Sequence, residues 1–116
     1  MLLTLLKSKI TTATVTHTEL EYEGSITIDE DVMEAAGLVA GEQVHVLNLN
    51  TGGRVITYVI PGERGSDAIC LNGPAARTGL VGDRVTILSY AHITEEEART
   101  WKTSLVRLDD RNRAIR

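Results

Sequence analysis

The segment EYEGSITID, residues 21–29, has a glycine directly before a serine at the entrance to a β-branched run. A glycine in a strand costs backbone entropy and offers no side chain to pack. Gly24 therefore predicts one of two things. Either the chain bends there, or the peptide bond between Gly24 and Ser25 takes part in chemistry.

A second group of reactive side chains lies in the segment RVITYVI, residues 54–60. In a strand, a spacing of two places Arg54, Ile56 and Tyr58 on one face and Thr57 on the other. The planar guanidinium of Arg54 matches a carboxylate. Arg54 could equally be a solvated strand charge, and Tyr58 a half-buried strand tyrosine, so both interpretations stay open at this point.

The composition is that of a soluble globular domain, with 42% hydrophobic and 24% charged residues and no phenylalanine. At 116 residues we expect one domain with an aliphatic core. The net charge of −4 argues against nucleic acid as a partner, because such proteins usually present a basic face. The opening MLLTLL is too short for a signal or membrane segment, so we expect a cytoplasmic protein with no membrane partner.

Cysteine and histidine give no sign of a metal site. Cys70 is the only cysteine of the chain and lies in an apolar strand pattern, which predicts a buried structural thiol. His17, His45 and His92 are scattered without the spacing of metal ligands.

The hydrophobic pattern predicts mostly strands with short helices between them. The N-terminal stretch reads as two strands or one long bent strand. Asp29 is the expected N-cap of a helix that ends at Gly37, and Thr94 with Glu97 forms a capping box for a second helix. The tail after residue 108 is charged, and we expect it to fray. The other expected elements are a hairpin around 50–53, strands over 25–28, 68–72 and 83–93, and a helical turn over 74–79.

Two stretches of the chain resemble each other. AAGLVAGEQVHVL, residues 35–47, and RTGLVGDRVTIL, residues 77–88, both run Gly-Leu-Val, then glycine and an acidic residue, then an alternating strand. A duplicated unit in a small β-rich chain predicts a closed barrel. Coincidental turn chemistry is the alternative.

These two halves, together with YEGS at 22–25, RVITYVI at 54–60, ERGS at 63–66, NGPAA at 72–76 and TEEEARTW at 94–101, resemble the pyruvoyl-dependent aspartate 1-decarboxylases. The resemblance spans nearly the whole chain, in order. It implies a single double-psi β-barrel domain over residues 1–116, mainly β with short helices, and assembly into a homotetramer. It also implies decarboxylation of L-aspartate to β-alanine and CO₂ for pantothenate and coenzyme A synthesis, with a maturation helper protein as a possible further partner.

The resemblance also implies a covalent cofactor that the chain makes from Ser25, with no metal. The chain would cut itself into residues 1–24 and 25–116 when the Ser25 hydroxyl attacks the Gly24 carbonyl, to which Thr57 would donate a hydrogen bond. Elimination and hydrolysis would then leave a pyruvoyl group. Its ketone would form a Schiff base with aspartate and accept the electrons released with CO₂. Tyr58 would return a proton to the former α-carbon.

The remaining family roles concern substrate binding. Arg54 and, as a second candidate, Lys9 would hold the two carboxylates of aspartate, and Thr57 would also contact the substrate. Lys9, like Arg54, could equally be a solvated strand charge. The loop formed by Asn72, Gly73, Pro74 and Ala75 would hold the substrate. The chain departs from the family at Thr11, where many members have histidine, and at Pro74, where many have alanine. Pro74 has no N–H, so no backbone donor is available at that position.

Two other classes of protein fit part of the pattern. The segment ITIDEDVMEAAGLVAGEQVHV also resembles the swapped-hairpin DNA-binding modules of AbrB-type regulators, although the acidic net charge disfavours DNA binding. An N-terminal-nucleophile hydrolase would cleave before Ser25 and keep its amine. A DNA-binding module would stay whole.

Overall fold

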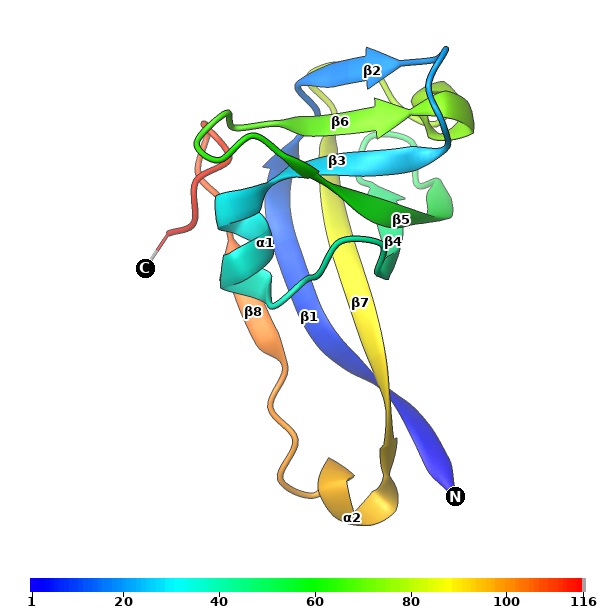
Figure 1. The fold of residues 1–116 in the computed structure, drawn as a ribbon, viewed down its shortest axis with the longest axis vertical. Helices are drawn as coiled ribbons and strands as arrows, with labels where there is room; N and C mark the ends of the chain where they lie inside the picture. The colour runs from blue at the N-terminus through cyan, green and yellow to red at the C-terminus, as the bar shows by residue number, and fades with distance from the viewer. Residues whose placement is uncertain (116) are drawn as a thin grey trace.

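The computed structural model describes residues 1–115, and the chain folds mainly into strands (Figure 1). Three short helical segments lie between them. The elements in chain order are β1 (Leu2–Thr14), β2 (His17–Glu19), β3 (Ser25–Asp29), α1 (Glu30–Ala36), β4 (Gln43–Asn48), β5 (Arg54–Gly62), β6 (Ile69–Asn72), the 3₁₀ helix η1 (Gly73–Arg77), β7 (Arg84–Thr94), α2 (Glu95–Ala98) and β8 (Ser104–Arg107).

The strands close into a barrel. Their hydrogen-bonded order is β2-β6-β3-β5-β4-β7-β1-β8. Because β1 runs almost directly into β2, one continuous segment pairs with β7 through β1 and with β6 through β2. The junction is bonded as well, since the Thr16 amide donates to the Ile69 carbonyl at 2.8 Å. Strand β8 adds to β1 outside the ring.

The barrel contains two parallel strand pairs, β2 with β6 and β3 with β5, and antiparallel pairs elsewhere in the ring. This arrangement confirms the expected mainly β fold of the double-psi β-barrel type with short helices. Its interior is aliphatic, as a chain without phenylalanine requires. The most deeply buried side chains include Ile10, Ile26, Ile28, Ile69, Leu71 and Ile87.

The internal resemblance corresponds to a real structural repeat. The Gly-acidic turns at Gly41-Glu42 and Gly82-Asp83 each exchange two backbone hydrogen bonds with one valine. Val59 is the partner of the first turn and Val15 the partner of the second. The acidic side chain of each turn also accepts a hydrogen bond from the backbone amide three residues earlier. The two halves are therefore built alike, which excludes coincidental turn chemistry.

The helix caps are as predicted. The Asp29 carboxylate accepts a hydrogen bond from the Asp31 amide, and Gly37 ends α1 in the left-handed conformation with φ 73°. Thr94 and Glu97 form the reciprocal capping box of α2. The N-terminal stretch is one long bent strand, β1, whose register shifts twice along β7, followed by the short β2.

The expectation of a frayed tail is wrong for the part that the structure describes. Asn112 is 2% exposed, and its side-chain amide bonds both the amide and the carbonyl of Thr14. It also donates to the Asp67 carbonyl. The tail is held because the buried side-chain amide of Asn112 hydrogen-bonds three backbone groups. The charged residues around Asn112 gave no sign of these contacts in the sequence. Arg116 lies outside the described residues.

Candidate active site

Ser25 opens strand β3 and is fully buried. Its hydroxyl donates a hydrogen bond to the Glu23 carbonyl at 3.0 Å. The hydroxyl oxygen in turn accepts one from the side-chain amide of Asn72, also at 3.0 Å. The oxygen atom next to the Gly24–Ser25 peptide bond is therefore fixed from two sides.

Asn72 ends strand β6 and faces Ser25 across the β3–β6 pair. Its Nδ2 donates to the Ser25 hydroxyl and, at 2.9 Å, to the Thr27 hydroxyl. Its Oδ1 accepts from the Cys70 thiol at 3.1 Å. The spacing of two along each strand places these four side chains on one face of the sheet.

Cys70 is half-buried rather than the buried structural thiol that its strand pattern predicted. Burial raises the pKa of the thiol, and the charge of Glu19 raises it further, so the thiol keeps its proton at neutral pH. Neither Cys70 nor Thr27 was predicted as a site residue. Their spacing of two from Asn72 and Ser25 is the signal that would have singled them out.

The loop after Asn72 packs directly on the segment before Ser25. Gly73 has φ 60°, and a Cβ atom built there would lie 2.5 Å from the Tyr22 carbonyl oxygen and 2.8 Å from the Gly24 nitrogen. A Cβ on Gly24 would lie 3.3 Å from Cδ of Pro74. The approach requires a glycine at position 73, whereas a Cβ atom at position 24 would be tight. Ala75, the next residue of the loop, is 2% exposed.

The β5 residues alternate as predicted. Arg54, Ile56 and Tyr58 are exposed, whereas Thr57 is half-buried on the other face. Strand β5 runs parallel to β3, with Ile26 opposite Val59. Extending this register by one residue places Tyr58 beside the strand position of Ser25.

The two predicted carboxylate-binding cations are not gathered around Ser25. Arg54 lies four residues from Tyr58 along β5, roughly 13 Å at the usual strand rise. Its guanidinium contacts Nδ1 of His45 at 3.0 Å. Lys9 lies on β1 between β7 and β8, strands that carry none of the other predicted site residues. Thr11 is on the same strand, opposite Arg107 of β8.

Comparison with known proteins identifies the family. The family model described as aspartate decarboxylase matches residues 1–115. An aspartate 1-decarboxylase of Caldicellulosiruptor saccharolyticus is 54% identical over 116 residues, which is 100% of this chain and 91% of the relative. That of Dehalococcoides mccartyi is 56% identical over 109 residues, 94% of this chain and 88% of the relative.

The chain belongs to the aspartate decarboxylase family. It is therefore an enzyme of the carboxy-lyase class, and the resemblance inferred from the sequence is confirmed. The AbrB-like alternative is not favoured. Among solved structures, the chain is similar to the computationally designed protein msDPBB_sym2, with a TM-score of 0.48 and 19% identity over 73% of this chain and 96% of the design.

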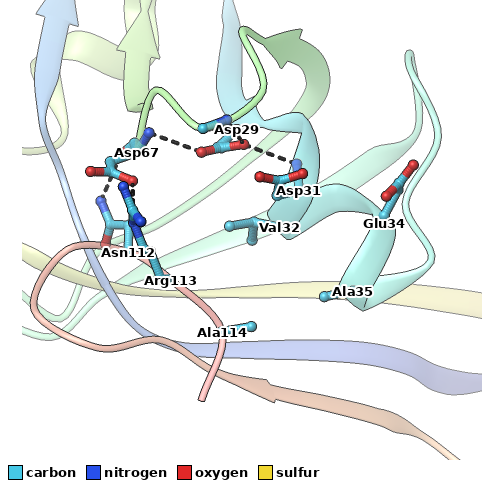
Figure 2. A pocket seen from close by; sticks show the side chains of 10 residues that line it. Asp29, Asp31, Val32, Glu34, Ala35, Asp67, Asn112, Arg113 and Ala114 are labelled. Carbon is cyan, nitrogen blue, oxygen red and sulfur yellow. Dashed lines mark hydrogen bonds and ion pairs between the residues drawn. The ribbon is translucent and has the colours of Figure 1, made fainter. Parts of the chain in front are cut away.

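A pocket of about 480 Å³ lies at the other end of β3 from Ser25 (Figure 2). None of its lining residues was predicted as a site residue of the decarboxylase. Figure 2 shows the Asp29 carboxylate pointing toward the α1 start and the loop before β6. The pocket is lined by Asp29, Asp31, Val32, Glu34, Ala35, Gly65, Asp67, Asn112, Arg113 and Ala114.

Asp29 has a structural environment rather than a catalytic one. Burial opposes its ionisation, but hydrogen bonds from the backbone amides of Asp31, Asp67 and Gly65 outweigh burial and lower the pKa of the carboxyl. Residues 1–115 of the decarboxylase contain no group of three His, Cys, Asp or Glu side chains placed to hold a metal ion. In the same part of the chain, no helix is long and apolar enough to cross a membrane.

Proposed function

We propose that the chain cuts itself between Gly24 and Ser25, converts Ser25 into a pyruvoyl group and decarboxylates L-aspartate to β-alanine and CO₂. One observation carries the proposal. In a member of the aspartate decarboxylase family, a fully buried serine directly follows the glycine against which Gly73 and Pro74 pack. Its hydroxyl is held between the Glu23 carbonyl and the Asn72 amide.

The cleavage begins with a transfer of the acyl group from nitrogen to oxygen. The Ser25 Oγ bonds to the Gly24 carbonyl carbon, the C–N bond between the two residues breaks, and the hydroxyl proton passes to the Ser25 nitrogen. Amide resonance is lost in this step, so a donor to the developing oxyanion is required. Thr57, on the strand paired with β3, is the proposed donor to the Gly24 carbonyl oxygen.

The resulting ester then eliminates. Loss of the Ser25 Cα proton breaks the Cβ–Oγ bond and releases the Gly24 carboxylate. Water replaces the nitrogen, which leaves as ammonia, and residue 25 becomes a ketone. The residues present fit this group, because the backbone of Gly73 packs against Gly24 with no room for a Cβ atom. The N–H that Asn72 directs at Oγ would face the released Gly24 carboxylate, beside the new group, once the Cβ–Oγ bond has broken.

The pyruvoyl ketone would take up the amine of the substrate and act as the electron sink for loss of the α-carboxylate. The residues of this chain supply the rest. Tyr58 would hold the proton that returns to the former α-carbon, since its phenol O–H is a hydrogen-bond donor. Asn72 and the backbone of Gly73, Pro74 and Ala75 would position the substrate, and Thr57 would contact it.

The positions of Arg54 and Lys9 support a homotetramer. Arg54 lies on β5 about four residues from the position next to Ser25, and Lys9 lies on β1, which does not pair with the strand of Ser25. The face of β5 that carries Arg54 and Tyr58 also carries Ile56, which is 56% exposed. In a symmetric assembly a neighbour would cover this face, and the cations of one copy could reach the substrate of another. Light scattering should give a tetramer, and a stable, active monomer at micromolar concentration would rule the assembly out.

The cellular context rests on the family resemblance. We propose that the enzyme works in the cytoplasm, that its β-alanine enters pantothenate and coenzyme A synthesis, and that a helper protein can assist its maturation. We propose no metal, membrane or nucleic-acid partner.

Mass spectrometry under denaturing conditions tests the self-cleavage. The purified chain should resolve into residues 1–24 and a fragment starting at residue 25 that is one ammonia lighter than the serine-started peptide. Ser25→Ala should stay intact, because no hydroxyl remains to receive the acyl group. Ser66→Ala removes an exposed hydroxyl from a loop and should cleave like the parent. A parent chain that stays whole after prolonged incubation contradicts the proposal, and a serine-started fragment indicates a hydrolase.

A further inference from the structure

The amide of Asn72 offers the Ser25 hydroxyl a hydrogen-bond donor in only one of its two orientations. The Ser25 hydroxyl has a single proton and donates it to the Glu23 carbonyl at 3.0 Å. The contact between Ser25 Oγ and Asn72 must therefore be a donation from Nδ2. This places Oδ1 of Asn72 on the opposite side, facing Cys70.

Cys70 holds the amide in that orientation. Its sulfur lies 3.1 Å from Oδ1 of Asn72, and its thiol can donate there. If the amide turned over, its oxygen could accept from the Thr27 hydroxyl, but no N–H would reach Ser25 Oγ and the NH₂ group would face the sulfur, which is a weak acceptor. Asn72 is 2% exposed, so its oxygen depends on a partner within the protein.

We propose that Cys70 is a positioning residue for the self-cleavage, acting through Asn72 on the Ser25 hydroxyl. The inference rests on the proposed self-cleavage and adds a residue to it. The thiol touches neither the scissile bond nor the serine. It keeps an N–H directed at Ser25 Oγ, and so keeps that oxygen in one place beside the Gly24 carbonyl.

The thiol is suited to this role because it stays protonated. Burial and the nearby charge of Glu19 both raise its pKa, which keeps the S–H available as a donor at neutral pH. A hydroxyl at the same position could make the same donation, whereas an aliphatic side chain could not.

The test compares the rate of fragment formation, followed by intact mass from the moment of refolding, in the parent and three variants. Cys70→Val fills similar space without a donor, Cys70→Ala leaves more space without a donor, and Cys70→Ser restores a donor. We expect Cys70→Val and Cys70→Ala to cleave about 3- to 10-fold more slowly, the range for one lost hydrogen bond. Cys70→Ser should cleave within about twofold of the parent.

A double-mutant comparison separates positioning from packing. If Cys70 acts through Asn72, Cys70→Val should cause no further slowing in an Asn72→Ala background. Equal slowing in both backgrounds, or Cys70→Val and Cys70→Ala cleaving at the parent rate, overturns the positioning role while leaving the self-cleavage intact. A parent chain that never cleaves overturns the proposed function itself, and this inference with it.

Discussion

Asp29 and Asn72 occupy matching places in the two halves of the barrel. Each ends a strand, precedes a short helix and leads through a Gly-acidic turn into a further strand. Asp29 caps its helix and also accepts backbone N–H groups of Gly65 and Asp67. Asn72 makes no capping bond, and its side chain instead contacts Ser25, Thr27 and Cys70.

The helices that follow differ accordingly. The capped start gives the regular α-helix α1, with acidic residues in its first turn. The uncapped start gives the 3₁₀ helix η1, with Pro74 near its beginning, where a missing N–H costs little. The same position in a repeated unit thus caps a helix in one half and binds the Ser25 hydroxyl in the other, because the Asn72 side chain makes no capping bond.

The largest contrast should come from Tyr58. Val59 and Val15 are equivalent in the two halves, because each bonds a Gly-acidic turn. The residue before Val59 is Tyr58 and the residue before Val15 is Thr14, so only one half has a phenol at this position. Tyr58→Phe should cleave itself normally yet form β-alanine about 10²–10⁴-fold more slowly, because a positioned acid is lost. Fragment mass and chromatographic β-alanine are measured on one sample. Turnover at the parent rate by the fully cleaved variant would make Tyr58 a packing residue.

Each half also has a glycine near its helix, Gly37 at the end of α1 and Gly73 at the start of η1. Gly37 and Gly73 both have positive φ, but a Cβ at Gly37 meets nothing within 4 Å, whereas one at Gly73 meets backbone at 2.5 Å. In a Ser25→Ala background that keeps the chain whole, Gly73→Ala should cost roughly 2–4 kcal/mol in urea unfolding. Gly37→Ala should cost about 1 kcal/mol, from the left-handed backbone alone. Equal costs would mean that the η1 loop can move away from Gly24.

The Asp29 cap should make the stability of the chain depend on pH. Its pKa is lowered in the folded chain, so its ionised form adds stability above its unfolded pKa of about 3.8, and this stability is lost as the pH falls through the folded value. Asp29→Ala should cost about 1–3 kcal/mol at pH 7, and the variant should lose less stability than the parent on acidification below about pH 4.

Asp110→Ala is the matched control for Asp29, since the side chain of Asp110 is 98% exposed. It should follow the parent in urea unfolding at both pH values. Self-cleavage of folded Asp29→Ala should proceed at the parent rate. Loss of cleavage in that variant would show that the two matching positions are not functionally separate.

Much of the local structure was readable from the sequence, because it depends on neighbours along the chain. Asp29, Gly37 and the Thr94–Glu97 box are set by backbone geometry within a turn. The alternation of Arg54, Ile56 and Tyr58 follows from the two-residue period of a strand. The order of motifs along the chain was also enough to indicate the family.

The tertiary structure alone decided which distant residues meet. Asn72 faces Ser25 because β3 and β6 pair, and Cys70 joins them because it lies two residues away on the same strand. Asn112 anchors a tail whose composition suggested disorder, since its amide finds backbone partners from distant segments. Such contacts depend on strand pairing and barrel closure, where residues far apart in sequence satisfy each other's buried polar groups, and no local pattern records them.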